Sequence, residues 1–215
     1  METMSAFHLV LSGDIRRSRD LPDRPALQRR LEGALRRVNE RFASSLTVPL
    51  SVVQGDAFQG LVGDISALIP LIITLEHQLA PATFRSGLGW GRLSTEMRGS
   101  TASMDGEAFH LARTALDQAR EADHWLVVHG LSDDDEIIAN GLAALLGATR
   151  RGWTASQQRA VSARRRHPSG KEAAVAAAIS APAMSRALRA AHYNEVLEAE
   201  VALGRLLARS TEGTP

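Results

Sequence analysis

Strand-like and helix-like patterns are distributed unevenly along this chain, and this distribution limits the folds it can adopt. Residues 1–130 alternate strand-like and helix-like segments, whereas residues 150–215 contain helix-like patterns alone. A chain of 215 residues is long enough for one large domain, or for one domain with a small appendage. We therefore expect an α+β domain over residues 1–149 and a small all-α domain over residues 150–215.

The first domain begins with segments in the order βαββαβ, followed by one more helix, strand and helix. Strands are expected at residues 8–12, 47–54, 57–62, 84–93 and 124–128, and helices at 25–42, 64–79, 105–121 and 132–146. The first six segments follow the ferredoxin-like split β-α-β pattern. This pattern predicts an antiparallel sheet with helices on one face and both strands of the central hairpin in its middle.

Three glycines at alternate positions mark the fourth expected strand: Gly87, Gly89 and Gly91. Alternate residues face the same side of a strand, so one face of this strand carries no side chains. A bare face allows a helix or a ligand to approach closely.

The second domain has the outline of a helix-turn-helix. Helices are expected at residues 155–165, 170–179 and 183–207, and residues 180–183 form the turn before the third. Residues 150–215 hold eleven basic and five acidic residues, whereas the rest of the chain has more acids than bases. A basic surface favours DNA as partner. The candidate DNA-binding residues are Arg164, Arg165, Arg166, Lys171, Ser185, Arg186 and Arg189. The alternative is a helical packing or dimerisation unit with a solvated basic face.

Several classes of protein are disfavoured by what the sequence lacks. It has no cysteine, which excludes disulfide scaffolds, cysteine-ligated zinc and iron–sulfur clusters. The longest apolar run, residues 67–75, contains a proline and is too short to span a bilayer. The N-terminal residues show no signal-peptide pattern, so we expect a cytoplasmic protein without membrane contact. The P-loop and the Gly-x-Ser-x-Gly elbow are both absent.

Two Gly-Asp pairs give the clearest indication of chemistry. Asp14 follows the first expected strand, and Asp56 lies in the two-residue connection of the hairpin. In the expected sheet these strands are neighbours, so the carboxylates would lie close together at one edge. Carboxylate and carbonyl oxygens suit Mg²⁺ or Mn²⁺, and such an ion can bridge a triphosphate. The alternative is that each aspartate only serves its turn.

Residues beside these aspartates could contact phosphates or a base. Arg16, Arg17 and Ser18 follow Asp14 in a loop, where guanidinium and hydroxyl groups can hold phosphate oxygens. The alternative is that this loop is only a solvated basic segment. Gln59 follows the hairpin connection and either reads a base edge or bonds its neighbour.

These motifs resemble those of class III nucleotide cyclases. The resemblance includes Asp14-Ile15 after the first strand and Gly55-Asp56 at the hairpin tip, with Phe58 behind it. It continues with the glycine strand at residues 85–91 and the helix start at residues 106–112. The resemblance covers about residues 7–130 and implies a cyclase-like fold, a metal–nucleotide ligand and a homodimer. The candidate nucleotide-binding residues are Ile15, Arg16, Arg17, Ser18, Gly55, Gln59 and Arg113.

The chain is still more similar to the SatD family of bacterial proteins. Three separated motifs carry this likeness, at residues 13–19, 55–61 and 105–113. A helix-turn-helix segment followed by the stretch at residues 189–193 extends it over nearly the whole chain.

One departure from the cyclases bears on catalysis. Cyclases place an asparagine and, four residues later, an arginine on the helix after the glycine strand, where the chain has His110 and Thr114. Arg113 comes one residue early, about 100° around the helix. Because phosphoryl transfer depends on positioned cations, we do not expect ordinary cyclase activity. No catalytic residue is assigned.

The sequence thus leads to one main hypothesis and two alternatives. The main one is a cytoplasmic regulatory protein that binds DNA through its C-terminal helices and a metal, nucleotide or other signal through its N-terminal domain. The first alternative is a metal-dependent nucleotidyl- or phosphoryl-transfer enzyme. The second is a dimeric structural adaptor.

Overall fold

We describe the fold from a computed structural model, which places residues 6–18, 23–96 and 99–212. The chain forms two compact units. The first comprises Met1–Ala144 together with Leu203–Pro215, and the second comprises Leu145–Ala202. This division differs from the expected boundary between residues 149 and 150, because the second unit begins earlier and the end of the chain returns to the first.

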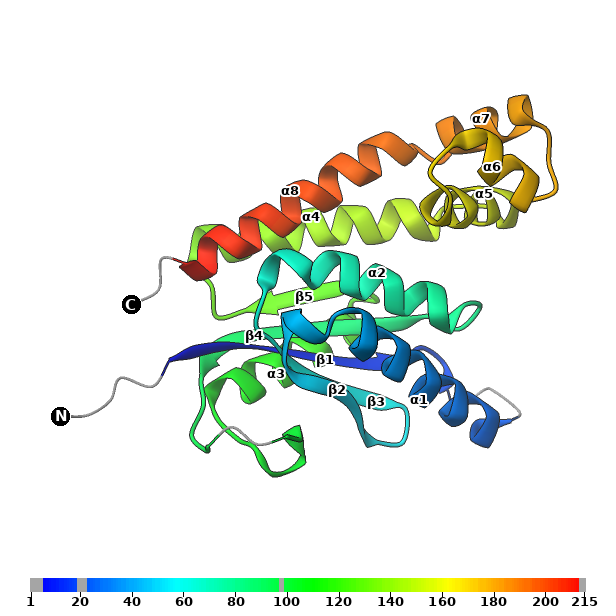
Figure 1. Cartoon of the computed structure of the whole chain (residues 1–215). Coiled ribbons are helices and arrows are strands. Elements are labelled where there is room, and N and C mark those ends of the chain that lie inside the picture. Colours follow the sequence, from blue (N-terminus) through cyan, green and yellow to red (C-terminus); the bar gives the residue numbers. More distant parts are fainter. Residues whose placement is uncertain (1–5, 19–22, 97–98, 213–215) are drawn as a thin grey trace. The chain divides into compact units, whose positions relative to one another are not determined.

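A five-stranded sheet forms the centre of the first unit (Figure 1), in the order β2-β3-β1-β4-β5. The strands are β1 (Phe7–Ile15), β2 (Leu46–Gln54), β3 (Ala57–Val62), β4 (Phe84–Arg92) and β5 (Leu126–His129). All neighbours are antiparallel except β4 and β5, which are parallel. The expected α+β class is therefore confirmed. The placement of the hairpin was wrong in one respect: β2 is an edge strand, because β3 lies between it and β1.

Helices cover both faces of this sheet, not one as expected. The longer helices of this part are α1 (Arg24–Arg41), α2 (Leu68–Leu79), α3 (Glu107–Glu121) and α4 (Asp133–Arg151). Short 3₁₀ helices cover Ala43–Ser45, Ile65–Ala67 and Thr101–Ser103. The helices α1 and α2 lie on one face, and α3 lies on the other (Figure 1).

The glycines of β4 explain where α3 lies. A Cβ atom at Gly89 would approach the Ala108 carbonyl oxygen to 2.1 Å, and one at Gly87 would approach the Leu116 nitrogen to 2.3 Å. Only glycine leaves room for a helix backbone at this distance. The bare strand face thus receives a helix.

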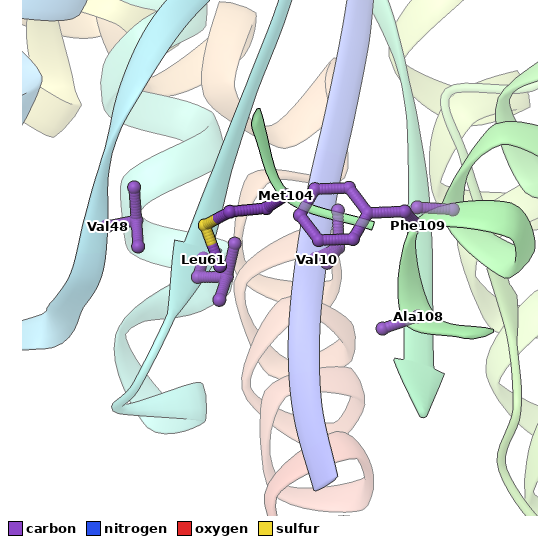
Figure 2. Close-up of a cluster of buried hydrophobic side chains, with 7 residues drawn as sticks. Val10, Val48, Leu61, Met104, Ala108 and Phe109 are labelled. Atoms are coloured by element: carbon purple, nitrogen blue, oxygen red, sulfur yellow. The ribbon is translucent and has the colours of Figure 1, made fainter. Parts of the chain in front are cut away.

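A small hydrophobic cluster completes the packing on this face (Figure 2). Val10 of β1 and Leu61 of β3 lie opposite one another in the sheet. Met104 extends toward Leu61 and Val48, and Phe109 at the start of α3 packs beside it (Figure 2). The cluster is formed by Val10, Val48, Leu61, Met104, Ala108, Phe109 and Ala112.

The first strand is longer than expected. The sequence pattern predicted its end at Ser12, but β1 continues to Ile15. The extra residues pair on both sides, and Asp14 lies opposite Ala57 of β3 and Arg85 of β4. Asp14 is therefore a residue within the sheet, not one in a turn after it.

The second unit is helical throughout. It contains α5 (Ala155–Arg166), α6 (Gly170–Ala176), α7 (Ala181–Ala190) and the first part of α8 (Tyr193–Glu212). The single long helix expected at residues 183–207 was wrong, because the chain turns at His192, whose φ is 50°. The Trp153 indole donates a hydrogen bond to the Ala191 carbonyl at 2.9 Å and holds this turn. No helix in the described part of the chain is long and apolar enough to cross a membrane.

Candidate functional site

Asp14, one of the two expected metal ligands, is bound by an arginine of α3. Its Oδ2 accepts a hydrogen bond from the Arg120 Nε at 2.9 Å, and Arg120 also donates to Asp117 at 2.6 Å. Partial burial alone would lower the pKa of Arg120, but the hydrogen bonds and charges of the two carboxylates raise it above its usual value. The Asp14 Oδ1 is buried and has no hydrogen-bond partner within residues 6–18, 23–96 and 99–212. One oxygen of Asp14 thus holds α3 on the sheet, and the other is unused.

Arg16 takes part in a second ion-pair group at the same edge of the sheet. Its guanidinium pairs with the Asp123 carboxylate and donates to the carbonyl oxygens of Asp123 and His124, at 3.2 and 3.0 Å. Arg85 of β4 pairs with the same carboxylate at 2.8 Å. Asp123 follows α3 in the left-handed backbone region, with φ of 54°. Arg16 therefore joins the end of β1 to the end of α3, and does not lie in an open basic loop.

Asp56, the second expected metal ligand, lines a small cavity of about 140 Å³. Ser18 and Gly55, both candidate nucleotide-binding residues, line the same cavity. Arg24 and Gln28 of α1 also line it, and sequence reasoning missed both. The hairpin turn is tight, with Gly55 at φ of 60°. The cavity brings residues of the first and second Gly-Asp motifs to one place.

The two aspartates are neighbours along the sheet but have different partners. Asp14 pairs with Ala57, the residue next to Asp56, so the register brings the two positions together. The described residues contain no group of three or more histidine, cysteine or acidic side chains that could hold a metal. The Asp14 carboxylate is bound by α3, whereas the cavity beside Asp56 is lined by α1, which covers the opposite face of the sheet. A cation in that cavity would therefore depend on Asp56 and main-chain oxygens.

The other candidate nucleotide-binding residues are dispersed. Gln59 bonds its neighbour, donating to the Ser12 hydroxyl at 2.8 Å. Ile15 is buried in β1 opposite Phe84. Arg17 and Arg113 are exposed, the latter on α3. Arg19, which belongs to the first SatD-like motif, lies outside the described residues.

In the second unit, α5, α6 and α7 all contact one another. Their shared core consists of small side chains around one methionine: Ala160, Ala163, Ala173, Ala174 and Met184. Alanine allows short helices to approach closely. Each helix begins at a capping hydroxyl, from Thr154, Ser169 and Ser180.

A short turn joins α6 to α7. Ala178 adopts φ of 53°, and the Ile179 N–H donates to the Ala174 carbonyl, which closes α6. Ser180 then caps α7, and Pro182 occupies its first turn. The alanine-rich helix α6 thus ends through the backbone geometry at Ala178, and four residues separate it from α7.

One face of α7 is buried and the other is exposed. Met184 is 1 % exposed, and Leu188 packs on the same core. Ser185, Arg186 and Arg189 are all exposed. These three residues are among the DNA-binding candidates expected from the sequence, and they share the exposed side of the helix.

The basic residues of α5 differ in their availability. Arg165 donates to both oxygens of Glu200, at 2.7 and 2.9 Å, and these side chains are 10 % and 5 % exposed. Arg164 donates to the His167 carbonyl at 3.0 Å and lies over the Tyr193 ring. Arg166 is exposed, as is Lys171 at the start of α6. Arg165 thus forms a buried ion pair, whereas Arg166 and Lys171 are accessible.

Known structures with some likeness to this chain are bacterial light-regulated adenylyl cyclases. One has a TM-score of 0.45 and 16 % identity, and the match covers 60 % of this chain and 44 % of that one. Another has a TM-score of 0.42 and 16 % identity, covering 57 % and 75 %. The chain thus spans less than half the length of the first of these. A comparison with curated proteins gave no match.

The match to a family covers more of this chain than either of these two structural likenesses. The SatD family model matches residues 8–191, which include β1, the hairpin, α3 and the helices α5 to α7. The motifs at residues 13–19, 55–61 and 105–113 all lie within this range. The chain therefore belongs to the SatD family.

Proposed function

We propose that this protein is a regulatory protein that binds DNA through α7. In this proposal α6 and α7 form a helix-turn-helix, and α7 lies in the major groove. The observation that carries the proposal is the exposed face of α7, with Ser185, Arg186 and Arg189 on one side and the buried Met184 on the other. Hydroxyl and guanidinium groups are suited to base edges and phosphates.

The surrounding charges support the same proposal. Residues 150–215 have six more basic than acidic residues, although Arg165 is neutralised by Glu200. Arg166 and Lys171 are exposed near the ends of neighbouring helices and can neutralise phosphates. We exclude Arg165 from the interface for this reason.

The test is equilibrium binding of the full chain to a random-sequence duplex at low salt. Replacing Arg186 and Arg189 by alanine should weaken binding at least tenfold. A matched double variant, Arg29→Ala with Arg36→Ala, removes the same charge from exposed positions on α1 and should bind like the wild type. Equal loss in both variants, or no binding by the wild type, would refute the proposal.

A second candidate function concerns the cavity beside Asp56. We propose that it receives the phosphates of a nucleotide, with Mg²⁺ or Mn²⁺ held by Asp56 and main-chain oxygens, because Asp14 does not line this cavity. The observation in its favour is that Ser18, Arg24 and Asp56 line one cavity. Its volume of about 140 Å³ suits a phosphate group, not a whole nucleotide. Bound in this way, the nucleotide would act as the signal for the DNA-binding unit.

Thermal unfolding tests this second candidate. A nucleoside triphosphate with Mn²⁺ at 100 times its dissociation constant should stabilise the protein by about 2.7 kcal/mol. Asp56→Asn should abolish the shift, whereas Asp133→Asn, at an exposed position on α4, should retain it. The absence of any metal-dependent shift across a panel of nucleotides would refute the proposal and leave DNA binding untouched.

A further inference from the structure

A cavity lies in the second unit, beside the exposed face of α7. Its volume is about 510 Å³, within the range of small-molecule sites. The residues that line it come from α5, α7, the start of α8 and Gly170 of α6. They are Arg164, Gly170, Ala181, Met184, Ser185, Leu188, Arg189, Tyr193, Asn194 and Glu195.

The lining of this cavity combines cations with an apolar surface. Arg164 and Arg189 contribute two guanidinium groups against one carboxylate, that of Glu195. Met184, Leu188 and the Tyr193 ring contribute apolar area. The charge balance favours a ligand with one negative charge, and the apolar area favours a ligand with a hydrocarbon or aromatic body.

Two side chains in the cavity have unused hydrogen-bonding groups. Tyr193 is 7 % exposed as a whole residue, but its hydroxyl is not one of the buried side-chain atoms that lack a partner, so it is accessible to a ligand in the cavity. Arg164 uses one amino group to bind the His167 carbonyl, and its other N–H groups have no partner in the described part of the chain. A carboxylate or other anionic group would accept from both side chains.

We propose that this cavity binds a small organic anion and that the bound anion opposes DNA binding. The anionic group would accept hydrogen bonds from Arg164 and Tyr193, and the apolar body would lie against Met184 and Leu188. The second part rests on the proposed function, because Ser185 and Arg189 belong both to this cavity and to the DNA-facing surface of α7. The same residues cannot serve both partners at once, so the two bind competitively.

The first experiment tests the anion site without DNA. The probe is 8-anilinonaphthalene-1-sulfonate, an aromatic anion whose fluorescence rises on binding. The full chain should bind one equivalent saturably, and Arg164→Gln should weaken binding about tenfold or more. Tyr193→Phe removes only the hydroxyl and should also weaken it. Arg159→Gln, at an exposed position of α5 outside the cavity, should have no effect.

Several outcomes would overturn this part. One is the absence of saturable binding, and another is equal binding by wild type, R164Q and Y193F. A third is that R164Q weakens duplex binding but leaves dye binding unchanged. In that case the cavity receives a DNA phosphate instead of a free anion. Circular dichroism of each variant confirms that lost binding does not reflect lost folding.

The second experiment tests antagonism with DNA. The dye should raise the apparent dissociation constant for the duplex in the wild type, and this effect should be lost in R164Q. If duplex affinity is independent of the dye while both bind, the antagonism is wrong. If the wild type binds the dye but no duplex, the proposed function fails and the anion site stands.

Discussion

Arg165 of α5 and Glu200 of α8 form a buried ion pair, in which one guanidinium nitrogen contacts both carboxylate oxygens at 2.7 and 2.9 Å. Removing one partner of such a pair leaves a charge buried without compensation, at a cost of about 3–5 kcal/mol. We therefore expect Glu200→Ala to lower the free energy of unfolding by about that amount. Urea denaturation measures it.

A double variant separates this cost from simple loss of contacts. Replacing both residues by methionine removes both charges and should restore much of the stability, because apolar pairs of similar volume often match a buried ion pair. If R165M/E200M is as unstable as Glu200→Ala, the pair is not the source of the loss.

The close approach of α3 to the sheet predicts an intolerance of side chains on β4. Gly89→Ala would bring a Cβ atom to 2.1 Å from the Ala108 carbonyl oxygen. We expect a loss of about 3 kcal/mol, at the upper end of overpacking costs. Gly141→Ala on α4 is the control, since nothing lies within 4 Å of its Cβ position, and it should gain up to about 1 kcal/mol. Equal effects of the two substitutions on thermal unfolding would contradict this account.

The stability of the first unit should decrease on mild acidification because of His8. Burial lowers the pKa of His8 below its usual 6.5, so the unfolded chain binds a proton more readily than the folded one. The contribution of His8 to the free energy of unfolding is therefore fully present above pH 6.5. It is lost as the pH falls toward the folded-state pKa. We expect the stability of the wild type relative to His8→Gln to fall between pH 7 and pH 5. A difference independent of pH in urea denaturation would contradict this.

Asp135 of α4 should also make the stability depend on pH, but in a more acidic range than His8. The Ser210 hydroxyl donates to it at 2.8 Å and is the main cause of its lowered pKa, with Arg209 contributing. A lowered pKa stabilises the fold above the unfolded value of 3.8, and this contribution is lost as the pH falls through the folded-state pKa. Ser210→Ala should therefore destabilise the protein at pH 7 and progressively less below pH 3.8.

Thr211→Ala provides the matched control for this prediction. Its hydroxyl donates to the Leu207 and Ala208 carbonyl oxygens, at 2.9 and 2.8 Å, and to no titratable group in the described part of the chain. The effect of Thr211→Ala on the free energy of unfolding should thus be the same at pH 7 and below pH 3.8. A pH-dependent loss in this variant, or a pH-independent loss in S210A, would show that Asp135 is not responsible.

The sequence predicted much of the fold because its signals are local. The hairpin of β2 and β3 has a glycine at positive φ in its turn, and the amphipathic pattern of α1 agrees with the structure within one residue at each end. The bare glycine face of β4 predicted the close approach of a helix or ligand, although not which of the two.

What the sequence did not show depends on contacts between distant residues. Nothing near Arg165 in the chain indicates that Glu200, 35 residues away, neutralises it. Asp14 looked like a turn residue because strand ends depend on pairing with β3 and β4, not on the strand's own residues. Arg24 and Gln28 carried no motif, and only the folded position of α1 places them beside Asp56.

The most direct test of DNA binding by α7 is the dependence of affinity on salt concentration. Each phosphate contact contributes a slope of about 0.9 in a plot of log K against log salt. The account predicts that Arg186→Ala with Arg189→Ala makes this slope shallower by about 1.8, while Arg29→Ala with Arg36→Ala leaves it unchanged. Equal slopes and affinities for all three proteins, or no binding by the wild type even at low salt, would contradict it.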